Sequence, residues 1–163
     1  MQPLLSRGNL LNLGMLLVLV AIVGGLGAIA SVDAPVFYEM LNKPSWAPHA
    51  DLFGPVWTVL YVLIAFSAWL LLSEHEWRHV RFEMTVYILQ LIVNTAWSWL
   101  FFGLHDGHAA LLDIGMLWMA ILINFMLFWR MHRWAGALLL PYLFWVSFAA
   151  ALNYTLCDLN PQL

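Results

Sequence analysis

Five apolar stretches divide this chain, and each is close to the length that an α-helix needs to cross a membrane. Such a helix takes about 20 apolar residues to cover a hydrocarbon core of roughly 30 Å. The sequence predicts spans at Leu10–Ala30, Leu52–Leu72, Met84–Phe102, Ala109–Trp129 and Trp134–Cys157. We therefore expect an all-α integral membrane protein, in which residues 1–163 form a single bundle of five transmembrane helices.

The composition supports a membrane-embedded chain and excludes several other classes. Only 9% of the residues are charged and 64% are hydrophobic, so there are too few polar side chains to cover a water-soluble globule. The net charge of −3 comes without a basic cluster, which makes nucleic acid an unsuitable partner. The single cysteine, Cys157, excludes an internal disulfide and a CxxC metal or redox site.

The basic residues predict the orientation of the bundle. With five spans, Lys43 lies on one face of the membrane, and the opposite face carries the arginines Arg7, Arg78, Arg81, Arg130 and Arg133. Positive residues favour the cytoplasmic side, so we expect a cytoplasmic N-terminus in a bacterial cell membrane. The long first connector, residues 31–51, and the C-terminus would then lie outside.

Polar, small and aromatic residues recur at helical spacing inside three of the spans. These sets are Trp57, Tyr61, Ala65 and Ala68 in the second span, Tyr87, Gln90, Asn94 and Trp97 in the third, and Pro141, Trp145, Ala149 and Asn153 in the fifth. Amide groups are costly in lipid, so these faces should point inward. They could serve only interhelical hydrogen bonding and core packing. Three such faces together favour an aromatic-walled pocket for a planar apolar ligand.

Four segments resemble the TspO/MBR family, which includes bacterial tryptophan-rich sensory proteins and the mitochondrial translocator protein. They are KPSW at Lys43–Trp46, GPVWTVLY at Gly54–Tyr61, QLIVNTAWSWLFFG at Gln90–Gly103 and LLPYLFWVSFAAALNY at Leu139–Tyr154. The resemblance extends in order from about Phe37 to Tyr154, whereas the first span is similar only in its glycines.

The resemblance implies a five-helix bundle, usually a homodimer, that binds porphyrins such as protoporphyrin IX and similar flat apolar ligands without a required cofactor. The proline-rich connector would be an ordered lid with Trp46 over the pocket; the alternative for Trp46 is a residue of the interfacial aromatic belt. The expected ligand-binding residues are Trp46, Trp57, Tyr61, Gln90, Asn94, Trp97, Trp145, Ala149 and Asn153.

An enzymatic alternative follows from the same resemblance, because some bacterial members are reported to degrade porphyrin in light. Trp57 and Trp145 would then be the catalytic residues. Binding without turnover is the preferred hypothesis, because the chain carries no hydrolytic triad, phosphate loop or cofactor fingerprint.

A metal-dependent alternative comes from the segment HEWRH at His75–His79, which satisfies the H-E-x-x-H pattern of zinc proteases. The pattern is short, and we expect solvated connector residues and no metal site. His49, His105, Asp106 and His108 on the outer face could also gather a metal or ligate haem iron, although loop histidines are usually only solvated.

Asp113 is an acidic residue placed just inside the fourth span. A carboxylate in the first turn of a helix is stabilised by the helix dipole. We therefore expect a structural role for Asp113, with a proton relay as the alternative.

Overall fold

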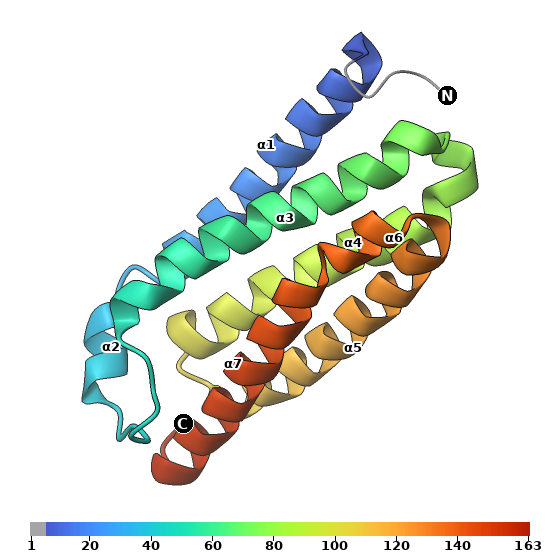
Figure 1. The fold of residues 1–163 in the computed structure, drawn as a ribbon. Helices are drawn as coiled ribbons and strands as arrows, with labels where there is room; N and C mark the ends of the chain where they lie inside the picture. Colours follow the sequence, from blue (N-terminus) through green and yellow to red (C-terminus); the bar gives the residue numbers. More distant parts are fainter. Residues whose placement is uncertain (1–5) are drawn as a thin grey trace.

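The structure is a computed structural model that describes residues 6–163, and its long helices run antiparallel in one bundle (Figure 1). Within the described residues all regular structure is helical, which confirms the all-α class. The five long helices are α1 (Arg7–Ala30), α3 (Phe53–Glu74), α4 (Trp77–Ser98), α5 (Gly107–Met131) and α7 (Leu140–Leu159). Each belongs to a segment long and apolar enough to cross a membrane, so the expectation of five spans is confirmed.

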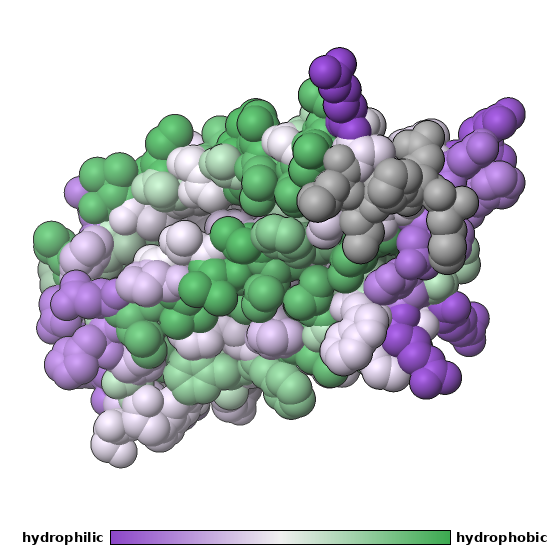
Figure 2. Space-filling view, turned by 45° about the horizontal axis from the view of Figure 1, so that its top comes forward, coloured by the Kyte–Doolittle hydropathy of each residue, from purple (hydrophilic) through white to green (hydrophobic). Residues whose placement is uncertain are grey.

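The order of packing places α1 against α3 and α4, then α4 against α5, and α5 against α7. The face drawn in Figure 2 carries a hydrophobic band between two polar ends. The lid end carries the α1–α3 connector and the C-terminus (Figure 1), and the arginine-rich end carries the α3–α4 and α5–α6 connections. We use these two names below.

Four short elements complete the chain: α2 (Ala34–Met40), the 3-10 turn η1 (Ala50–Leu52), the π-helical turn η2 (Trp99–Gly103) and α6 (Arg133–Ala137). η2 continues α4 to the lid end, and α6 continues into the fifth span. The Asp106 side chain accepts a hydrogen bond of 2.8 Å from Ala109 N and so caps α5.

The third span begins earlier than its hydrophobicity predicts. Its helix starts at Trp77, seven positions before the expected Met84, because residues 77–83 mix charged and apolar side chains and extend the helix beyond the apolar core. The helical connector segment α2 was also not expected from the sequence. Both differences arise because hydropathy indicates which residues lie in lipid, whereas helical backbone can also form outside the lipid.

The connector from residue 31 to 52 is an ordered cover at the lid end. Phe37 in α2 packs against Phe101 and Phe102, with ring centroids 5.9 and 6.5 Å apart, and stacks on His105 at 4.0 Å. The far part of the connector is tied to the end of α7, because the Asn160 amide accepts from Asn42 N at 2.9 Å and donates to Asn42 O at 3.0 Å. Contacts on two sides hold this cover, which we call the lid.

Candidate functional site

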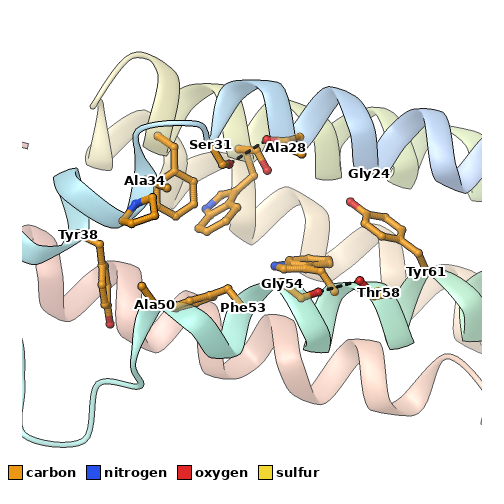
Figure 3. A pocket seen from close by; sticks show the side chains of 16 residues that line it. Gly24, Ala28, Ser31, Ala34, Tyr38, Ala50, Phe53, Gly54, Thr58 and Tyr61 are labelled. Atoms are coloured by element: carbon orange, nitrogen blue, oxygen red, sulfur yellow. Dashed lines mark hydrogen bonds between the residues drawn. The ribbon is translucent and has the colours of Figure 1, made fainter.

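A cavity of about 420 Å³ lies beneath the lid, between α1, α2, α3 and the end of α4. One wall is made of small residues on α1, and the other carries aromatic side chains of α3 and α4 (Figure 3). The lining residues used below are Gly24, Gly27, Ala28, Trp57, Tyr61 and Trp97. The volume falls in the range of about 300–1,000 Å³ that is typical of small-molecule sites.

The α1 wall is flat because its residues lack bulk. A Cβ at Gly24 would lie 3.2 Å from the Tyr61 ring, and one at Gly27 would lie 3.3 Å from Ser98 Oγ. Ala28 on α1 and Thr58 on α3 line the cavity and are also exposed, so the cavity opens sideways between these helices toward the surrounding lipid. The helices pack closely at these two glycines, and the cavity is lined by small residues and aromatic rings with one open edge.

Two of the expected binding residues form the α3 part of the aromatic wall. The Trp57 and Tyr61 rings lie 5.6 Å apart, one helical turn from each other, and both line the cavity. Trp97 reaches the cavity from α4 and stacks on Phe101 at 5.5 Å. The structure thus brings Trp57, Tyr61 and Trp97 together, as their spacing predicts.

Asn94 lies behind this wall and braces it. Its Oδ1 accepts a hydrogen bond of 2.7 Å from the Tyr61 hydroxyl, and its Nδ2 donates to the Tyr142 hydroxyl at 3.0 Å. Asn94 is buried and is not among the cavity lining. It therefore links α3, α4 and α7 and fixes the orientation of Tyr61.

Asn153 braces Trp97 in a similar way. Its Oδ1 accepts from Trp97 Nε1 at 3.2 Å, and its Nδ2 donates to Gly107 O at 3.1 Å. Gln90 and Ala149 are buried in the core and do not line the cavity either. For these residues a direct ligand contact stays a prediction, and the hydrogen bonds of Asn153 serve the packing of the helices.

Trp145 and Trp46 lie at a different surface. Trp145 lines an apolar groove between α3 and α7, together with Val59 and Phe148, and this groove is separate from the cavity of Trp57. Trp46 is 48% exposed and packs on Phe148 with the rings 5.8 Å apart. The spacing of residues along α7 could not show whether its aromatic face lines the cavity or the α3–α7 groove. A ligand role for Trp46 and Trp145 stays a prediction.

The residues of the H-E-x-x-H pattern do not share a helix. His75 ends α3 and Glu76 precedes α4, both with extended backbone, so His75 and His79 are separated by a break between helices. A zinc-protease site needs both histidines on one helical face, so the structure does not support the zinc-protease alternative. Over residues 6–163, no three side chains of His, Cys, Asp or Glu gather as metal ligands, and this includes His105 and His108.

The lid end of the cavity is shaped by Tyr38, whose hydroxyl donates to Pro48 O at 3.1 Å. Burial, and to a lesser extent the charge of Glu39, raises the pKa of Tyr38 above its ordinary value of 10.0. The hydroxyl therefore keeps its proton at neutral pH and remains a donor. Lys43 lies 4.8 Å from the centroid of the same ring and 3.1 Å from Glu39, which further orders the lid.

Several lining residues were not expected to bind ligand. They include the α1 glycines and Phe53, Phe102 and Tyr38. The small residues of α1 are visible in the sequence, but small residues in a membrane helix equally indicate close helix packing. Only the position of α1 beside α3 and α4 distinguishes the two roles.

Comparisons with known proteins agree on one group of relatives. A family model described as the TspO/MBR family covers residues 15–158. The chain is 40% identical to the Tryptophan-rich protein TspO of Chlorobaculum tepidum, over 77% of this chain and 80% of that protein. It is 37% identical to Protein CrtK of Rhodobacter capsulatus, over 86% and 88%, and 32% identical to the human Translocator protein, over 72% and 71%.

Proposed function

The chain belongs to the TspO/MBR family of multi-pass membrane proteins, and from this premise we propose that its cavity binds a flat, largely apolar ligand of the porphyrin class. The family membership confirms the resemblance that the sequence motifs carry. In this proposal the protein is a receptor or sensor that needs no cofactor of its own and takes part in tetrapyrrole regulation or transport.

The observation that carries this proposal is the lining of the cavity. Trp57, Tyr61 and Trp97 line a cavity of about 420 Å³ together with Gly24 and Gly27. Such a lining favours a planar molecule, because aromatic rings stack on its faces and glycines permit close approach. The open edge between α1 and α3 would accept the polar substituents of a macrocycle that is wider than the cavity.

Orientation and assembly complete the proposal. The five arginines lie at one end of the bundle, so we place that end and the N-terminus in the cytoplasm of a bacterial cell, and the lid outside. A homodimer is the expected assembly for this family. Lipid would then deliver an apolar ligand directly to the open edge of the cavity.

The two tryptophans at different surfaces provide a matched test. We expect Trp57→Ala to weaken the binding of protoporphyrin IX by about tenfold, because stacking contributes about 0.5–1.5 kcal/mol in addition to the buried area. Trp145→Ala removes an equal indole from the α3–α7 groove and should leave the affinity nearly unchanged. The affinity of each variant is measured by titrating the purified protein with protoporphyrin IX in the dark and monitoring the quenching of tryptophan fluorescence.

The reverse result would relocate the site. If Trp145→Ala lowers the affinity and Trp57→Ala does not, the ligand lies in the α3–α7 groove. If the parent protein shows no saturable binding of protoporphyrin IX, the porphyrin class is wrong for this chain.

A second candidate function is the light-dependent degradation of the same ligand. The observation that favours it is the indole of Trp57 in the cavity wall, where it would contact an excited porphyrin. Illumination of the bound complex would then deplete porphyrin and require Trp57. We rank this below simple binding, because only aromatic side chains of the lining, Trp57, Trp97, Tyr38 and Tyr61, could take part in such chemistry.

A further inference from the structure

A stripe of polar side chains runs through the core along α4. Glu83, Tyr87, Gln90 and Asn94 follow one another at steps of four, three and four, so they share one face of the helix. The stripe extends about 16 Å along the axis, at 1.5 Å per residue. It begins near the arginine-rich end and stops at Asn94, directly behind the cavity wall.

Most of this stripe has no hydrogen-bond partner within residues 6–163. The Glu83 Oε2, the Tyr87 hydroxyl and both polar atoms of the Gln90 amide are buried without a partner. Tyr87 is fully buried and Gln90 is 1% exposed. The facing helix α5 adds two more such atoms, Asp113 Oδ2 and Asn124 Oδ1, again among buried residues.

The contacts of this stripe connect it across the helices. Asn124 Nδ2 donates to Glu83 O at 3.3 Å, so α4 and α5 meet at the start of the stripe. The Tyr142 hydroxyl on α7 accepts a hydrogen bond from Asn94 Nδ2 at 3.0 Å, so α7 meets the other end of the stripe. Asn124 and Asp113 are about 16 Å apart along α5, so the unpaired groups follow the length of the stripe.

The position of Asp113 differs from the sequence-based expectation. α5 begins at Gly107, so Asp113 lies in its second turn, and Asp106 caps the helix instead. The helix dipole acts mainly within the first turn and does not account for a buried carboxyl group at this place. No salt bridge to Asp113 forms within the described residues.

We propose that ordered water molecules occupy the core between α4, α5 and α7 and hydrogen-bond to Gln90, Tyr87, Asn124 and Asp113. Buried water binds to otherwise unpaired buried polar groups, and removing it is costly. Both ends of one amide, a phenol and a carboxyl group offer the donors and acceptors that such water needs. The water site is independent of any ligand in the cavity.

The amide of Asn94 sets the limit of this site. Tyr61 and Tyr142 both hydrogen-bond to Asn94, whose oxygen accepts from Tyr61 and whose NH₂ group donates to Tyr142. An amide does not hand a proton from one side to the other as a hydroxyl or water does. The water site therefore hydrates the back of the cavity wall without forming a proton path into the cavity.

Radiolytic labelling tests for this water directly, because hydroxyl radicals produced from bound water modify adjacent side chains even when these are buried. We expect Tyr87 and Tyr142 in the purified full chain to be oxidised several-fold faster than Phe101, which is equally buried but lies among aromatic rings. Labelling in ¹⁸O water should place the heavy isotope on both tyrosines. Equal, slow oxidation of Tyr87, Tyr142 and Phe101 would overturn the proposal.

The variant Gln90→Leu gives a second, independent readout. With water present, it removes hydrogen bonds, lowers the labelling of Tyr87 several-fold and does not raise the melting temperature. If the Gln90 amide is instead dry and unpaired, replacing it with an apolar side chain raises the melting temperature. Should the variant fail to fold, the labelling of the parent protein alone decides the outcome.

Discussion

Replacing Asn94 with leucine removes the link that joins three helices behind the cavity. Leucine has a similar size but cannot bond the Tyr61 hydroxyl at 2.7 Å or the Tyr142 hydroxyl at 3.0 Å. Each interhelical hydrogen bond in a membrane is worth about 0.6–2 kcal/mol, and an orphaned buried hydroxyl costs about 1–3 kcal/mol. We therefore expect Asn94→Leu to lower the free energy of unfolding by about 2–4 kcal/mol, while the bundle still forms.

A double-mutant cycle separates the hydrogen bond from general effects of the substitution. Unfolding by denaturant in detergent should show that Tyr142→Phe destabilises the parent protein but is neutral or stabilising in Asn94→Leu, where it removes an unpaired hydroxyl. Porphyrin affinity should fall through the loss of Tyr61 orientation. If Tyr142→Phe has the same cost in both backgrounds, Asn94 and Tyr142 are not coupled and the reasoning fails.

Three further predictions concern chemistry, topology and the lid. If bound porphyrin is lost in light, Trp57→Phe should slow the loss, because phenyl is harder to oxidise, whereas Trp129→Phe should not; equal rates in Trp57→Phe and the parent would exclude Trp57. The variant His49→Cys should react with an impermeant thiol reagent in intact cells, and labelling only in broken cells would reverse the proposed orientation. Asn160→Ala removes the two hydrogen bonds to Asn42 and should speed both entry and release of ligand; unchanged stopped-flow rates would show that this contact does not hold the lid.

The spans were accessible to sequence analysis because lipid imposes length and hydropathy on each helix separately. The same holds for residues on one helical face, so the grouping of Trp57 with Tyr61 is recovered from their spacing. What a single helix cannot reveal is its neighbour. Trp145 follows the same spacing rule, yet its helix contributes to the α3–α7 groove and not to the cavity.

The small residues of α1 also show that the sequence of one helix does not reveal its neighbours. Gly24 and Gly27 have no chemistry that marks a ligand site, and only the structure shows that they line a cavity while packing closely on Tyr61 and Ser98. The π-helical turn η2 is likewise invisible in the sequence, because it depends on how the end of α4 meets α5. Arrangement around the bundle, and not local pattern, determined these features.

The location of the ligand is the central claim, and filling each hollow in turn tests it most directly. Ala28 lines the cavity and Val59 lines the α3–α7 groove, and both are exposed, so a phenylalanine at either place should leave the fold intact. We expect Ala28→Phe to abolish saturable binding of protoporphyrin IX in a dark titration, with Val59→Phe binding as the parent does. Retained affinity in Ala28→Phe together with lost affinity in Val59→Phe would contradict a binding site between α1 and α3.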